Sequence, residues 1–117
     1  MMRSTMALVL ALITGPLPLQ AAEAFLCTFQ TECYEDEACG ETTFAAEVDV
    51  KGEKLVTEFG DLIIVAVKKR PALMTLFATG DGAEYLLSIT PKAARLSPHA
   101  NEGPQVISYL GSCEGAF

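Results

Sequence analysis

The sequence predicts an all-β protein: a single small antiparallel barrel or sandwich of about eight strands, stapled by disulfides, after an N-terminal signal peptide. Three observations lead to this fold class. Short segments alternate apolar and polar residues at period two, as half-buried strands do. Turn residues recur about every 8–12 positions. The chain carries four cysteines, an even number that a small exported domain uses for disulfides.

The first 24 residues have the pattern of a secretory signal peptide. Arg3 precedes the apolar run "MALVLALIT", which is too short to span a bilayer, and prolines and small residues follow. Cleavage is expected after Ala21 or Ala24. The sequence thus divides into a signal peptide (1–24) and one all-β domain (25–117). We expect a periplasmic or secreted protein that makes no membrane contact after signal cleavage.

The mature chain is acidic, and its charge is uneven along the sequence. All 15 acidic residues lie beyond residue 21, against 7 of the 8 bases, which gives a net charge of −8. Residues 22–61 carry −9 and residues 62–117 carry +1. Nucleic acid is therefore a poor partner for the N-terminal half, because its phosphates would be repelled, and we expect no nucleic acid partner. A basic protein would be attracted. Solubility alone also accounts for such acidity.

The spacing of the cysteines favours disulfides over a metal or redox site. Zinc sites use closer cysteine pairs or several histidines, and redox sites use C-x-x-C, which is absent. Period-two alternation places Cys27 and Cys113 on matching faces of the first and last strands. Cys33 and Cys39 then close the short acidic loop "YEDEA". This pairing, 27–113 with 33–39, is preferred because a 27–33 bond would have to bridge an extended strand.

The remaining segments are interpreted as short strands and turns. The segment 42–50 alternates apolar and polar residues, and a turn is expected at Gly60-Asp61. The apolar run Leu62–Val67 indicates either a strand covered on both faces or one end of a contact surface. Gly80-Asp81-Gly82 is a strong hairpin signal. The segment "PHANEGP", residues 98–104, is expected to be a loop.

The residues needed for catalysis are scarce. His99 is the only histidine, and we expect it to be an exposed loop residue rather than a general base. With all thiols paired, no cysteine nucleophile remains. The sequence has no phosphate loop, haem signature or metal-binding pattern. We therefore expect no enzymatic activity, no catalytic residue, no metal and no cofactor.

The chain resembles two groups of exported proteins. "FLCTFQTEC", "ATGDGAEYLLSI" and "SYLGSCE" together resemble small exported bacterial proteins without an assigned function. A more distant resemblance is to C-type lysozyme inhibitors, eight-stranded barrels with a Ser-Gly-x-x-Tyr motif and a nearby lysine that enter the lysozyme cleft. Gly82 and Tyr85 match the glycine and tyrosine of that motif, and Asp81 stands in place of its serine. Lys92 stands for the lysine. The resemblance makes these four residues binding candidates. Alternatively, Gly82 only shapes a turn and Tyr85 packs inward.

Three functions are compatible with the sequence. The first is a non-enzymatic binding or interaction module for an unknown, basic protein partner. The second is a periplasmic inhibitor of C-type lysozyme. The third is a small-ligand carrier that uses the barrel interior, although five large side chains expected to point inward favour a packed core: Phe25, Phe44, Tyr85, Leu87 and Ile89. The sequence leaves the oligomeric state open.

Overall fold

The computed structural model describes residues 22–103 and 105–117, and this part of the chain folds into eight strands. The predicted signal peptide lies outside the described residues as far as residue 21. The strands are β1 (Ala24–Tyr34), β2 (Gly40–Asp49), β3 (Lys54–Thr57), β4 (Gly60–Arg70), β5 (Leu73–Gly80), β6 (Ala83–Ile89), β7 (Ala94–Ala100) and β8 (Gln105–Glu114).

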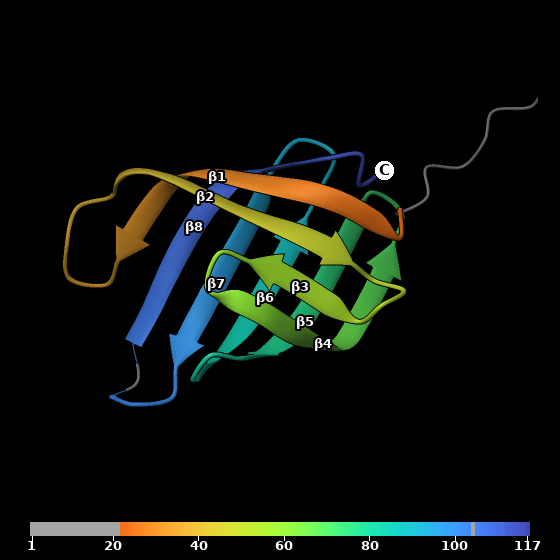
Figure 1. Ribbon diagram of the computed structural model, residues 1–117. Coiled ribbons are helices and arrows are strands. Elements are labelled where there is room, and N and C mark those ends of the chain that lie inside the picture. The colour runs from red at the N-terminus through yellow and green to blue at the C-terminus, as the bar shows by residue number, and fades with distance from the viewer. Residues whose placement is uncertain (1–21, 104) are drawn as a thin grey trace, which may run out of the picture.

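The strands form a closed antiparallel barrel in which each pairs with its neighbour in sequence, and β8 pairs back onto β1 (Figure 1). The predicted all-β class is confirmed, and of its two architectures the barrel is the one formed. Closure gives every strand a neighbour on both sides, although the four-residue β3 pairs with only part of β2 and part of β4. Because successive strands alternate in direction, successive loops alternate between the two ends of the barrel.

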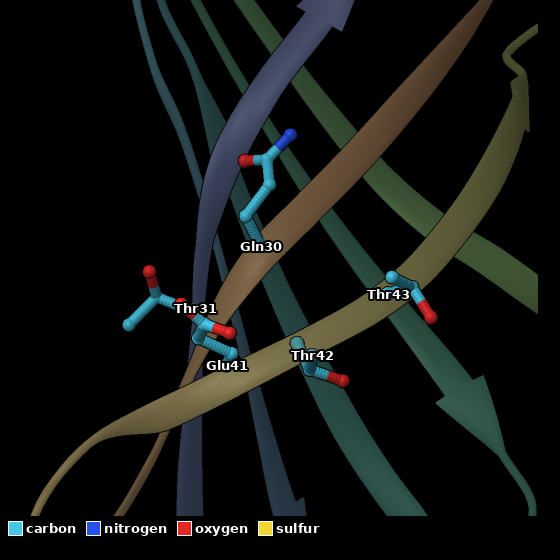
Figure 2. A pocket seen from close by; sticks show the side chains of 5 residues that line it. All are labelled: Gln30, Thr31, Glu41, Thr42 and Thr43. Carbon is cyan, nitrogen blue, oxygen red and sulfur yellow. The ribbon is translucent and has the colours of Figure 1, made fainter.

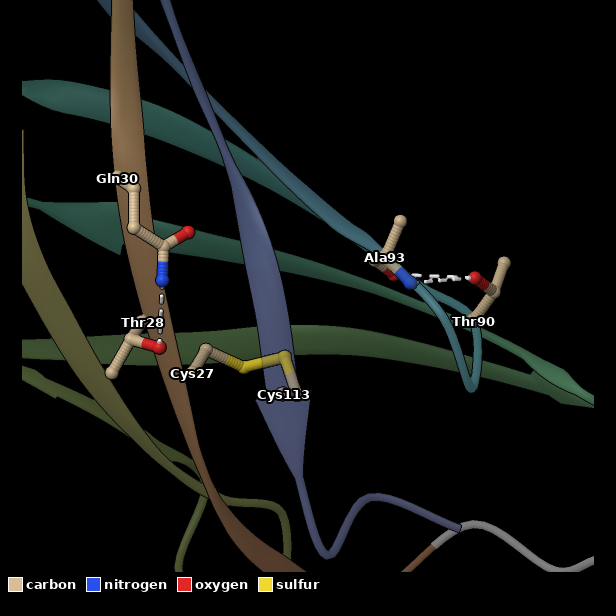
Figure 3. Close-up of a disulfide and its surroundings, with 6 residues drawn as sticks. All are labelled: Cys27, Thr28, Gln30, Thr90, Ala93 and Cys113. Carbon is tan, nitrogen blue, oxygen red and sulfur yellow. Dashed lines mark hydrogen bonds between the residues drawn. A yellow bond between two sulfur atoms is a disulfide. The ribbon is translucent and has the colours of Figure 1, made fainter. Parts of the chain in front are cut away.

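Both disulfides join the cysteines that the strand pattern pairs. Cys27 and Cys113 are direct cross-strand partners on β1 and β8, with Cα atoms 3.9 Å apart, and their bond fastens the seam that closes the barrel (Figure 3). Cys33 and Cys39 enclose the loop between β1 and β2. Bonds of this kind form and persist in oxidising compartments outside the cytoplasm.

The core fills the barrel unevenly. Fully buried side chains gather in the middle and toward the end where β1 begins and β8 ends, including Met74, Ile89 and Leu96. No charged residue is buried among the described residues. Toward the other end the inward side chains Tyr85 and Ile107 are only partly buried. The barrel is therefore packed at one end and open at the other.

A β-bulge on β1 brings two backbones unusually close. The pairing of β1 with β8 shifts between Phe29 and Thr31, next to Gly111. A Cβ atom at Gly111 would overlap the carbonyl oxygen of Thr28 and lie 2.6 Å from the Cα of Phe29. Only glycine can occupy this position without moving β1.

Three sequence interpretations are corrected by the strand boundaries. The turn expected at Gly60-Asp61 lies two residues earlier, at Glu58-Phe59, and β4 already begins at Gly60. The run Leu62–Val67 is not covered on both faces, because its outward side chains are exposed. His99 lies in β7 rather than in a loop, because that strand continues to Ala100 and pairs His99 with Glu84.

The residues just before β1 take part in the barrel. The amide of Ala22 donates a hydrogen bond to the carbonyl of Ala116 at 2.7 Å, and the carbonyl of Glu23 accepts one from Val50 at 2.7 Å. Of the two expected cleavage sites, the one after Ala21 would keep both hydrogen bonds.

Candidate functional site

The two ends of the barrel differ sharply in charge. One end carries the loops β1–β2, β3–β4, β5–β6 and β7–β8, and we call it the acidic end. Ten acidic residues lie in these loops or in the adjoining strand halves: Glu32, Glu35, Asp36, Glu37, Glu41, Glu58, Asp61, Asp81, Glu84 and Glu102. No Lys or Arg of the described residues lies there. The local charge is −10.

The opposite end, where β1 begins and β8 ends, holds every Lys and Arg of the described residues: Lys51, Lys54, Lys68, Lys69, Arg70, Lys92 and Arg95. With five acids beside these seven bases, its net charge is +2. The charge is therefore separated along the barrel axis as well as along the sequence, because alternating strand directions bring acidic loops from both halves of the chain to the same end. Such a separation attracts cations to one end.

The most acidic loop is fastened to the barrel wall. Glu35 accepts a hydrogen bond from the backbone amide of Val106, at the start of β8, with its Oε1 2.8 Å from the nitrogen. The Cys33–Cys39 disulfide closes the same loop at its base. Three successive acids, at 35–37, are therefore held at the acidic end despite their mutual repulsion.

A cavity of about 250 Å³ opens at the acidic end, where the core stops. Its lining is mainly apolar and aromatic, with one acidic residue: Phe44, Phe59, Asp81, Ala83, Tyr85, Pro98, Ala100, Ile107 and Tyr109. These residues come from strands β2, β6, β7 and β8 and from two end loops. We call this cavity the aromatic pocket.

Three rings form a stack that leads from the rim of the aromatic pocket to its interior. Phe59, in the β3–β4 loop, is 63 % exposed and stacks on Phe44 with ring centroids 5.8 Å apart. Phe44 in turn stacks on Tyr109 at 4.9 Å. Phe29 packs against two of these rings, with its ring centroid 6.0 Å from that of Phe44 and 6.3 Å from that of Tyr109. The three stacked rings belong to the aromatic part of the pocket lining, and the faces of aromatic rings carry negative quadrupole charge.

The two tyrosines of the pocket remain neutral well into the alkaline range. Burial raises the pKa of Tyr85, and the nearby negative charge of Asp81 raises it further. Burial also raises the pKa of Tyr109, followed by a hydrogen bond to Glu32 and the charge of that carboxylate. Both phenols therefore keep their protons at neutral pH.

The structure brings together three of the four residues that the sequence analysis singled out. Asp81 and Tyr85 line the aromatic pocket, and Gly82 lies between them at its rim. Asp81 and Gly82 have φ angles of 51° and 70°, the left-handed conformation that a two-residue hairpin needs, so the turn role of Gly82 is also present. Lys92 is separate from this group, because it lies in the β6–β7 turn at the opposite end of the barrel.

Two important pocket residues were not candidates in the sequence analysis. Phe59 lies just after a short strand, and nothing in its local pattern distinguishes an exposed aromatic ring from a core residue. Tyr109 alternates inward on β8, which predicts burial but not its contact with Phe44 across the barrel. That contact depends on closure, which joins segments far apart in the sequence.

A larger hollow of about 530 Å³ lies over the β1–β2 hairpin, next to the bulge. Its lining comes from two strands, with Gln30 and Thr31 on β1 and Glu41, Thr42 and Thr43 on β2 (Figure 2). The side chains are polar, mostly short, and splayed around an open surface. This hollow has no aromatic wall, so the aromatic pocket is the better-formed binding site.

Within residues 22–103 and 105–117, no three His, Cys, Asp or Glu side chains gather closely enough to hold a metal ion. The same ranges contain no helix long and apolar enough to cross a membrane.

Comparison with protein-family models, curated proteins and solved structures returns no match for this chain.

Proposed function

We propose that the protein is an exported, non-enzymatic binding module for a basic protein partner. In this proposal it acts in the periplasm or after secretion. The acidic end attracts the partner, and a Lys or Arg side chain of the partner enters the aromatic pocket. The observation that carries the proposal is the position of this pocket, at the same end of the barrel as ten carboxylates and with no base among the described residues there.

The lining of the pocket suits a cationic group with an apolar stem. Ring faces attract cations, and each desolvated cation–π contact contributes about 2 kcal/mol. The rings of Phe44, Phe59 and Tyr109 line the pocket, and Asp81 supplies a carboxylate at the rim. Because both tyrosines of the pocket are neutral at pH 7, Asp81 is the only charged residue in the lining.

The size of the pocket favours a single side chain over a larger ligand. Small-molecule sites usually enclose about 300–1,000 Å³, and this pocket encloses about 250 Å³. The rest of the barrel is filled by buried side chains. These facts favour a protein partner over the small-ligand carrier that the sequence also allows.

The proposal is tested by calorimetric titration of the protein with a pentalysine peptide and with the same peptide acetylated on every lysine. We expect the charged peptide to bind and its affinity to fall about tenfold or more from low to high salt, because screening weakens the attraction. We expect the neutral peptide not to bind. Equal binding of both peptides, or binding that ignores salt, would contradict the proposal.

A second candidate, inhibition of C-type lysozyme, is favoured by the convergence of Asp81, Gly82 and Tyr85 at the pocket. The position of Lys92 at the other end speaks against the inhibitor motif as a whole. The test is C-type lysozyme activity in the presence of a micromolar excess of the protein. Unchanged activity would remove this candidate while leaving the broader proposal in place.

A further inference from the structure

The outer wall of the barrel carries an apolar surface on β4 and β5. Four of the eight large apolar side chains that are exposed in the described residues belong to this surface: Ile63, Leu73 and Phe77, and Val65 at the β4 bulge. Val67 is also exposed, but it pairs with the buried Leu76 and therefore lies on the inner face of β4. Ile63 and Val65 are 60 % and 62 % exposed. Contiguous exposed apolar side chains on a sheet face commonly mark an interaction surface.

The strand register arranges this surface in rows. Ala66, Phe77 and Leu86 form the middle row across β4, β5 and β6, with Val65 at the adjacent bulge. We call the outward side chains of these three strands the β4–β6 face. The neighbouring strands β3 and β7 lie two strands from β5 in the closed ring, so their outward side chains turn away from this face.

The two ends of the β4–β6 face carry opposite charges. Toward the acidic end, Asp61 lies beyond Ile63 on β4, and Glu84 lies on β6. Glu84 also accepts a hydrogen bond from the Thr79 hydroxyl at 3.0 Å. Toward the other end, Lys68 and Arg70 lie on β4, opposite Thr75 and Leu73. The face thus runs from acidic through apolar to basic.

Such a pattern is complementary to itself. We propose that the β4–β6 face binds a second copy of this chain in a two-fold symmetric dimer. A two-fold axis within the interface, crossing the strands at the level of Phe77, places Phe77 against its counterpart. The same axis places Asp61 of each copy over Arg70 of the other, because both lie about two rows from the middle on the same strand.

This arrangement leaves the acidic ends of the two barrels free and pointing in opposite directions. The dimer therefore does not depend on the proposed cation-binding function, and either can fail alone. A flat apolar face of three strands is small for a permanent dimer, so we expect a reversible, concentration-dependent association.

Sedimentation equilibrium of the mature protein over a range of concentrations tests the dimer. We expect the mass to rise from monomer to dimer and no further, since a two-fold interface closes on itself. Phe77→Ser should weaken the association about tenfold or more, because it removes the central apolar contact. Leu26→Ser, which changes a similarly exposed side chain on β1, is the matched control and should leave the association unchanged.

Charge reversal tests the geometry. Asp61→Arg and Arg70→Asp should each weaken self-association, because each places like charges opposite one another. An equimolar mixture of these two variants should dimerise again, because both cross-contacts then pair opposite charges. A monomer at all concentrations, or an equal effect of Leu26→Ser and Phe77→Ser, would overturn the proposal. So would a mixture that stays monomeric, or a monomeric protein whose β4–β6 face binds anionic lipid vesicles instead.

Discussion

Phe44 stacks on Tyr109 across the barrel interior, with ring centroids 4.9 Å apart and ring planes 24° from parallel. These residues lie on β2 and β8, which are not neighbours in the sheet, since β1 runs between them. The contact marks the level at which the packed core ends and the aromatic pocket begins. It also ties the stability of the barrel to the protonation of one phenol.

Tyr109 should make the protein sensitive to alkaline pH. Its pKa in the folded state is raised above the usual value of 10.0, mainly by burial. The stability that the neutral phenol contributes is fully present below about pH 10, the pKa in the unfolded chain. It is lost as the pH rises above that value, because the unfolded chain then forms the phenolate and the folded state resists it. We expect the free energy of unfolding to fall above pH 10, and to fall less in Tyr109→Phe. Urea unfolding between pH 7 and 11 measures the free energy of unfolding of the wild type and of Tyr109→Phe. Identical dependence on pH in the two proteins would show that Tyr109 is not the group responsible.

Phe59 should matter for binding and little for folding. Its ring is 63 % exposed and contacts Phe44 at the pocket rim. We expect Phe59→Ala to cost less than about 1 kcal/mol of stability, within the range of a single aromatic pair. The same change should weaken pentalysine binding about tenfold. Phe77→Ala, which removes an exposed ring from the barrel wall, is the control and should leave peptide affinity unchanged.

Gly111 should tolerate no side chain. A Cβ there would overlap the Thr28 carbonyl oxygen and crowd Phe29, so β1 would have to move where the Cys27–Cys113 bond fixes it. We expect Gly111→Ala to destabilise the protein by about 1–3 kcal/mol, the usual cost of overpacking. Gly40→Ala is the matched control, because nothing lies within 4 Å of its added carbon. Thermal unfolding of both variants would show equal shifts if the close approach were unimportant.

The two disulfides should contribute unequally to stability. Cys27–Cys113 closes a separation of 86 residues and Cys33–Cys39 one of 6. In the chain-entropy model the long closure contributes about 4–5 kcal/mol and the short one about 2 kcal/mol. We expect replacement of Cys27 and Cys113 by serine to lower stability about twice as much as replacement of Cys33 and Cys39. A larger loss from the short loop would contradict this order.

The sequence predicts most of the fold because period-two alternation and turn residues are local signals. The alternation of 42–50 places Phe44 inward, and Asp81-Gly82 specifies its hairpin without any tertiary information. The boundaries that were wrong lie where local signals are ambiguous. Pro98 predicts a loop, yet the structure accommodates it in β7, opposite Tyr85 of β6.

The candidate site was only partly predictable because it depends on closure of the ring. Asp81, Gly82 and Tyr85 belong to one hairpin, so a short motif could identify them together. Phe44 and Tyr109 lie on strands far apart in the sequence and meet only when β8 returns to β1. The same topology gathers acidic residues from both halves of the chain at one end of the barrel, which no local pattern shows.

The central claim is that the aromatic pocket at the acidic end binds a cationic side chain. Its most direct test is a two-dimensional amide NMR titration of the mature protein with the pentalysine peptide. We predict the largest shifts at Phe59, Asp81, Tyr85 and Tyr109, with little change at the Lys92 turn on the opposite end. Shifts confined to the β1–β2 hollow or spread evenly over the acidic loops, or the absence of any shift, would contradict the account.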